Sequence, residues 1–156
     1  MTMNAPTDDY EARIARLKTP QDCRAYAENA KRLGREDLVP ACLLREAELL
    51  ADLGKVIAAT DFEKRILRDI CLLERLSGKP LSRTRPMIAR HGFVRMVERI
   101  VTKPGESSGF KLAVQHGLAH ATFEQAVCDN PELFSEEALA ASQTRLELLR
   151  ASTAGT

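Results

Sequence analysis

Apolar residues recur every three or four positions over most of the chain, which is the spacing of one buried face of a helix. The first clear stripe consists of Cys23, Ala27, Ala30 and Leu33. Thr19 and Pro20 stand directly before it, and a Thr N-cap followed by Pro in the first turn is typical of a helix start. Gly34 ends the pattern. We predict a helix between these two boundaries.

Two more stripes of the same kind follow. They consist of Leu38, Cys42, Leu49 and Leu53, and of Phe62, Ile66, Ile70 and Leu73. We predict Asp37 and Asp61 as the N-caps of these two helices, and Gly54 and Gly78 as the residues that end them.

The first two of these helices are separated by a short turn, which predicts a helical hairpin. The polar face of the third helix, which carries Arg65, Arg68 and Asp69, is predicted to be solvated. We therefore interpret residues 8–78 as a helical-hairpin lobe that serves as a scaffold or an interaction surface.

The predicted elements become shorter in residues 79–151, which we interpret as a second lobe. Here a short helix twice ends at a His-Gly pair and a further helix follows. The pairs are His91-Gly92 and His116-Gly117, 25 residues apart. They indicate two helix–turn–helix units, which arose either by internal duplication or by the common packing of helical hairpins.

The fold class predicted from these patterns is all-α, with about eight or nine helices. No long alternating run of β-branched residues predicts a strand. Apolar residues make up 44% of the 156 residues but aromatic ones only 4%, so the core must be built from Leu, Ala, Ile and Val. Such a core suits interlocking helices.

The cysteines and the N-terminus indicate a cytoplasmic protein without a membrane segment. Cys23, Cys42, Cys71 and Cys128 are far apart and read as reduced core thiols. The first residues have no signal-peptide pattern, and no apolar run approaches the length of a membrane span. His116 and His120 are four apart, but Gly117 separates them, so we expect no metal and no cofactor.

Charge is distributed unevenly along the chain. Residues 1–78 have a net charge of −1, residues 79–120 have eight Lys or Arg against two Asp or Glu and a net charge of +6, and residues 121–156 have a net charge of −4. A basic middle segment indicates an anionic partner, most simply the phosphates of duplex DNA. The alternative is that the acidic C-terminal helix neutralises it internally.

The predicted phosphate contacts are six of the eight basic residues of this middle segment: Arg83, Arg85, Arg90, Arg95, Lys103 and Lys111. Arg83 and Arg85 precede Pro86, where a helix should begin, and cations at the positive end of a helix are favourable only if an anion is bound there. We therefore expect a phosphate cradle, unless these arginines pair with carboxylates such as Glu74.

Residues 109–129 resemble, in a general sense, the helix-turn-helix of bacterial regulators. If the helix after Gly117 reads bases, the contacts would come from Ala119, His120, Thr122 and Gln125. Two features depart from the pattern. His116 stands where an apolar residue usually packs, and the acidic residues Glu124 and Asp129 lie on the helix that should approach phosphates.

The chain lacks a nucleotide-binding glycine loop, a nucleophile-elbow motif and paired carboxylates in an apolar setting, so we expect no enzyme. Our leading hypothesis is a non-enzymatic, nucleic-acid-associated protein. The alternative is a helical adaptor or small regulatory subunit that binds a protein partner, or forms a homodimer, through its C-terminal helix. An exposed Leu/Ala stripe on residues 136–150 would favour that alternative.

Overall fold

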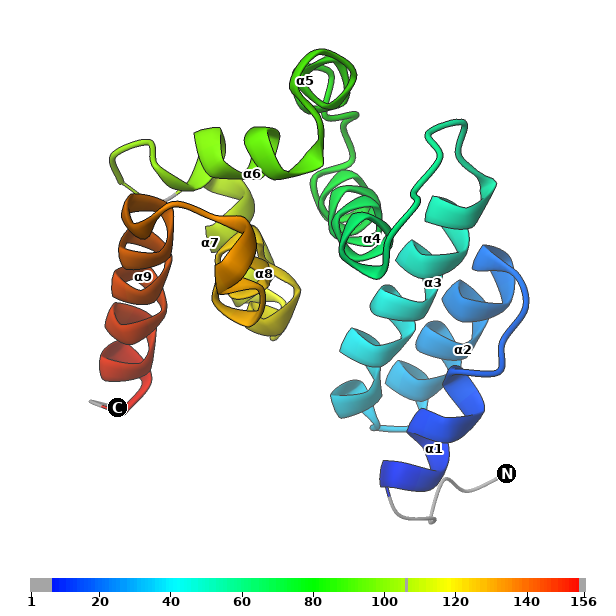
Figure 1. Ribbon diagram of the computed structural model, residues 1–156. Coiled ribbons are helices and arrows are strands. Elements are labelled where there is room, and N and C mark those ends of the chain that lie inside the picture. The colour runs from blue at the N-terminus through cyan, green and yellow to red at the C-terminus, as the bar shows by residue number, and fades with distance from the viewer. Residues whose placement is uncertain (1–6, 106, 155–156) are drawn as a thin grey trace.

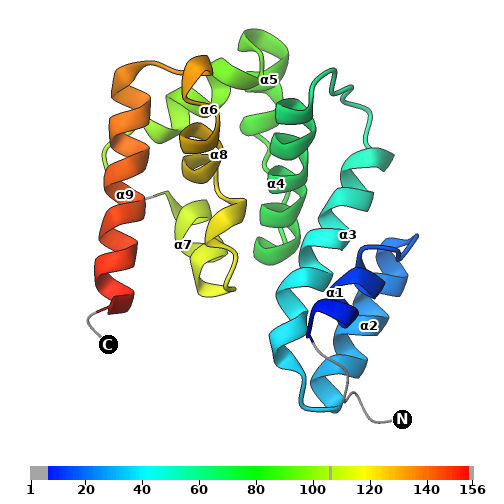
Figure 2. The ribbon, with the colours of Figure 1, turned by 60° about the horizontal axis from the view of Figure 1, so that its bottom comes forward.

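The protein is helical throughout the described part of the chain. The computed structural model describes residues 7–105 and 107–154, and within these ranges it contains nine α-helices, three 3-10 turns and no strand (Figures 1 and 2). The predicted all-α class is therefore confirmed. The α-helices are α1 (Thr7–Ile14), α2 (Pro20–Arg32), α3 (Val39–Leu53), α4 (Asp61–Ser77), α5 (Thr84–His91), α6 (Phe93–Val101), α7 (Ser108–Gln115), α8 (Phe123–Asp129) and α9 (Glu136–Ala154).

Helices α2 and α3 lie side by side as a hairpin, with α1 packed against them (Figure 1). The hydroxyl of Thr19 accepts a hydrogen bond of 3.0 Å from the backbone of Asp22, as expected of an N-cap. Gly34 follows α2 with φ +76°, a conformation that glycine adopts without strain. Tyr10, Ile14, Ala30, Leu38 and Cys42 form the buried core of this part.

Two of the predicted N-caps are displaced. Asp37 does not cap α3, because a 3-10 turn (Glu36–Leu38) leads into that helix and the Asp37 carboxylate pairs with Arg35 at 3.0 Å. Asp61 is the first residue of α4, and the cap is Thr60, whose hydroxyl accepts a 3.1 Å hydrogen bond from the backbone of Glu63.

Helix α4 is buried on two sides and lies between α3 and the α7–α8 region in both views (Figures 1 and 2). One side contributes Ile66 and Ile70 to a core with α5, α6, α8 and α9. The other side contributes Leu72 to a core with α3, α7 and the 3-10 turn η2 (Ala119–Ala121), and Leu73, at the end of the Ile66–Ile70 stripe, joins this second core. The lobe boundary predicted after residue 78 coincides with the end of α4, yet both cores include this helix.

The C-terminal element is longer than the sequence indicated, since α9 continues to Ala154, past residue 151. Glu98 of α6 helps to place it, because its carboxylate accepts a 2.9 Å hydrogen bond from the backbone of Ser135 directly before α9. Within the described ranges no helix combines the length and the apolar character that crossing a bilayer requires.

Two isoleucines allow a matched test of this core. Ile70 is 0% exposed on α4, whereas Ile57, in the loop before α4, is 88% exposed. We expect Ile70→Ala to lower the free energy of unfolding by about 2–5 kcal/mol, because it leaves a cavity between α4 and its neighbours. Ile57→Ala should change it by no more than about 0.5 kcal/mol. Urea unfolding followed by circular dichroism measures both, and equal losses would contradict the assignment of the core.

Candidate nucleic-acid interface

Helices α5 and α6 form a corner on the outside of the molecule. They are joined by Gly92, which has φ +83°. The inner face of α6 packs Met96, Val97 and Val101 into the core. Since residues three and four apart share a helix face, Arg95 and Arg99 lie together on the outer one.

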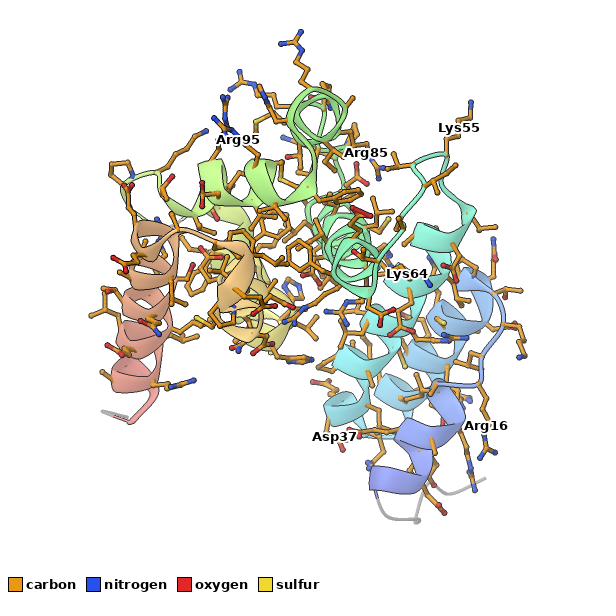
Figure 3. The ribbon with its side chains drawn as sticks, viewed as in Figure 1. Arg16, Asp37, Lys55, Lys64, Arg85 and Arg95 are labelled. Atoms are coloured by element: carbon orange, nitrogen blue, oxygen red, sulfur yellow. The ribbon has the colours of Figure 1, made fainter. Side chains whose placement is uncertain are left out.

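The outer surface of this corner carries a cluster of cations, which we call the α5–α6 basic face. It consists of Arg90, His91, Arg95 and Arg99, all exposed. Loss of hydration lowers the pKa of His91, and the charges of Arg99, Arg95 and Arg90 lower it further, so each of these arginines lies within electrostatic range of His91. Figure 3 shows Arg95 on the outer side of the corner.

The three arginines of this face have no acidic partner among the described residues: none of the ion pairs found there includes Arg90, Arg95 or Arg99. Glu98, the nearest acidic residue in the sequence, is hydrogen-bonded to Ser135 instead. No carboxylate of α9 therefore forms an ion pair with these three guanidinium groups.

The predicted phosphate cradle at the start of α5 is not formed. Arg85 is half-buried and makes an ion pair with Glu74 of α4, and this contact raises the pKa of its guanidinium group. The backbone N–H groups of Thr84 and Arg85 both donate to the carbonyl of Leu81. Glu74 also accepts a 2.8 Å hydrogen bond from the backbone of Leu81, so this cluster fastens α5 to α4.

The remaining predicted phosphate contacts are exposed but dispersed. Arg83 precedes α5, and Lys103 follows α6 by two residues. Lys111 lies on α7, which packs mainly against α4 and η2. The structure thus brings Arg90 and Arg95 together and adds Arg99, which the sequence placed on the face of Arg95.

The predicted base-reading helix is divided in two. Residues 119–129 form η2 and then α8, because Thr122 between them is extended and caps α8. Its hydroxyl accepts from the backbone of Gln125 at 3.1 Å and donates to the carbonyl of Ala119 at 2.9 Å. Phe123, Ala126 and Val127 of α8 are buried in the core.

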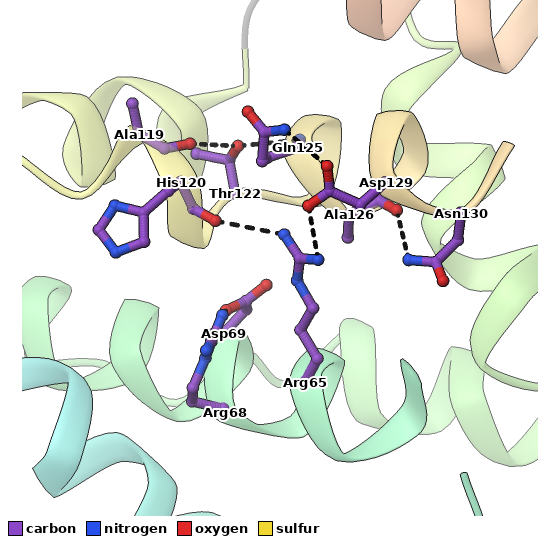
Figure 4. Close-up of polar contacts among 10 residues, drawn as sticks. All are labelled: Arg65, Arg68, Asp69, Ala119, His120, Thr122, Gln125, Ala126, Asp129 and Asn130. Carbon is purple, nitrogen blue, oxygen red and sulfur yellow. Dashed lines mark hydrogen bonds and ion pairs between the residues drawn. The ribbon is translucent and has the colours of Figure 1, made fainter. Parts of the chain in front are cut away.

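Hydrogen bonds tie this segment to α4 (Figure 4). Arg65 donates to the carboxylate of Asp129 at 2.8 Å and to the carbonyl of His120 at 3.3 Å. The side-chain amide of Gln125 donates to Asp129 at 2.9 Å. His120 is exposed, but partial loss of hydration, followed by the charges of Arg68 and Arg65, lowers its pKa. The helix-turn-helix interpretation is corrected here: η2 and α8 are packed against the fold, so they do not form a projecting recognition helix.

Asp69 differs most from its predicted surroundings, because it is fully buried on the α4 face that was expected to be solvated. One carboxylate oxygen accepts from Arg68 at 3.0 and 3.1 Å. The other has no partner among the described atoms. Burial raises the pKa of Asp69 to about 7, against the opposing charges of Arg68 and Arg65. The apolar residues Ile66 and Ile70 around it were the available signal, since Asp69 follows Ile66 by three positions.

Comparison with known proteins found no matching family model, no matching curated protein and no matching solved structure. The described residues also contain no group of three or more His, Cys, Asp or Glu side chains placed to hold a metal ion.

Arg83 and Arg85 provide a test of the different environments at the start of α5. We expect Arg85→Ala to lower the free energy of unfolding by about 1–3 kcal/mol, because Glu74 loses its charged partner. Arg83→Ala removes an exposed side chain with no ion pair and should stay within about 0.5 kcal/mol of the wild type. Denaturant unfolding compares them, and a larger loss for Arg83→Ala would contradict the described contact.

Asp69 predicts a specific dependence of stability on pH. Burial raises the pKa of Asp69 in the folded state from 3.8 to about 7. The folded protein therefore holds this proton more tightly than the unfolded chain does, so the contribution of Asp69 to the free energy of unfolding is fully present below about pH 4 and is lost as the pH rises through 7. Asp69→Asn cannot ionise, so its free energy of unfolding should rise relative to the wild type between those pH values, by roughly 4 kcal/mol at most.

Urea unfolding at several pH values between about 4 and 7 measures the difference in free energy of unfolding between Asp69→Asn and the wild type. Asp52→Asn, which changes an exposed aspartate on α3, is the control and should follow the wild-type curve. Parallel curves for Asp69→Asn and the wild type would show that Asp69 titrates normally.

Proposed function

We propose that this protein binds nucleic acid, most simply duplex DNA, through the phosphate backbone and without enzymatic activity. The contacts come from Arg90, Arg95 and Arg99 of the α5–α6 basic face. The single observation that carries this proposal is that these three arginines are exposed on two consecutive helices and form no ion pair with a described carboxylate. Arg83 and Lys103, at the two ends of the α5–α6 unit, extend the positive surface.

Phosphate is the anion that this arrangement fits best. Guanidinium groups bind phosphate oxygens through two parallel hydrogen bonds, and a row of them releases the counterions of a polyanion. Arg95 and Arg99 are one helical turn apart, so both can contact the same backbone. Since η2 and α8 are packed into the fold, base reading is not part of the proposal, and we expect weak sequence preference.

A second candidate is a helical adaptor or homodimer that uses α9. The observation in its favour is Leu148, which is 62% exposed on α9, together with the exposed Ala140 and Ala151. These residues share one face, but Thr144 interrupts it and Leu146 is buried, so the apolar stripe is short.

A salt titration of binding to random-sequence duplex DNA tests the first candidate. The logarithm of the binding constant should fall linearly with the logarithm of salt concentration, with a slope of about −0.9 for each phosphate contacted. Removing two contacts in the double variant Arg90→Ala, Arg95→Ala should make the slope shallower by about 2 and weaken binding at every salt concentration.

The matched control is the double variant Arg16→Ala, Lys18→Ala, which removes the same charge from two exposed residues between α1 and α2. Figure 3 shows Arg16 at the opposite end of the molecule from Arg95. The control should keep the wild-type slope. Equal losses of affinity in both double variants would show that binding depends only on the net charge of the protein. No binding at low salt would favour the adaptor.

A further inference from the structure

A small pocket lies where helices α4, α5, α6 and α7 and the start of α8 meet. Its volume is about 150 Å³. Most of its wall is apolar and consists of Leu73, Leu81, Ile100, Phe110 and Phe123. A cavity of about this volume lined by Leu, Ile and Phe can hold one benzene ring. The pocket is thus large enough for a single six-membered ring.

Thr84 is a buried polar residue of this wall whose hydroxyl lacks a described partner. It is only 9% exposed, and its hydroxyl makes no hydrogen bond to a described residue. Two other hydroxyls of the lining are occupied: that of Ser107 accepts from the backbone of Phe110 at 3.1 Å, and that of Thr122 caps α8. Ser108 is exposed. The Thr84 oxygen is not among the fully buried atoms without a partner, so it remains accessible from the pocket that Thr84 lines, where water or a ligand can satisfy it.

The start of α7 adds two hydrogen-bond donors to the same pocket. Ser108 and Gly109 line it, and their N–H groups belong to the first turn, where no helical carbonyl is available. Gly109 also lets α7 approach α4, since a Cβ atom at this position would lie 3.0 Å from a methyl group of Leu73. One wall therefore offers N–H and O–H groups, and the remaining wall is mainly apolar.

We propose that this pocket binds a small neutral molecule with an apolar ring or short branched body and a carbonyl oxygen. The oxygen would accept from Thr84 and from the first turn of α7, and the body would contact the leucine and phenylalanine side chains. A neutral ligand fits better than an anion, because the described lining contains no Lys or Arg, and its one charged residue, Glu124, is an acid paired with Arg145 at 3.0 Å. The proposal is independent of nucleic-acid binding.

Cyclohexanone is a suitable probe, because it combines a six-membered apolar ring with one carbonyl. We expect it to shift the backbone amide NMR signals of Thr84, Gly109 and Ala121 saturably, and cyclohexanecarboxylate to bind more weakly. Thr84→Val keeps the shape of the side chain but removes the hydroxyl, and should weaken binding about two- to tenfold. Thr144→Val, at an exposed position of α9, is the control and should bind as the wild type does.

A second variant keeps the test informative if Thr84→Val fails to fold. Ala121→Leu fills part of the pocket and should abolish the saturable shifts without changing the helix content. Absence of saturable shifts in the wild type, unchanged affinity in both pocket variants, or tighter binding of the carboxylate would each overturn the proposal.

Discussion

The burial of α4 on two opposite sides is the constraint on which the rest of the structure depends. Ile66 and Ile70 anchor α5, α6, α8 and α9, and Leu72 anchors α3 and α7. Polar contacts also connect α4 to its neighbours. Glu74, near the C-terminal end of α4, pairs with Arg85 of α5, and Arg65 of α4 donates hydrogen bonds to the η2–α8 segment. Because α5 is fastened in this way and α6 buries its apolar face, the remaining arginines of this corner face outward.

The arginines of this protein consequently divide by environment. Arg65, Arg85 and Arg145 are at least partly buried, and each is paired with a carboxylate from another helix, so they serve the packing of the fold. Arg90 and Arg95 are exposed and have no described carboxylate partner. An exposed, unpaired arginine contributes little to folding, and a cluster of them creates a local positive potential that favours a polyanion.

The sequence predicted the helices well, because periodic apolar residues and short-range signals such as Thr19 and Gly78 act within one element. It predicted the site only in part. The outward position of Arg95 follows from helical spacing, but the pairing of Arg85 joins two helices, and the sequence left Glu74 only as an alternative partner. The sequence did not predict that residues 119–129 divide into η2 and α8 at Thr122. A threonine side chain can either continue a helix or cap a new one, and tertiary packing decides which of the two occurs. The burial of Asp69 was missed because a charged residue on an amphipathic helix is usually solvated.

If the protein binds duplex DNA as proposed, the phosphates contact the α5–α6 basic face and not the η2–α8 segment. Backbone amide NMR spectra recorded during a titration with duplex DNA distinguish these two surfaces, because every residue gives a separate signal. We expect the largest shifts on residues 90–99 and small changes over residues 119–129. Shifts concentrated on residues 119–129, or none on residues 90–99 at low salt, would contradict it.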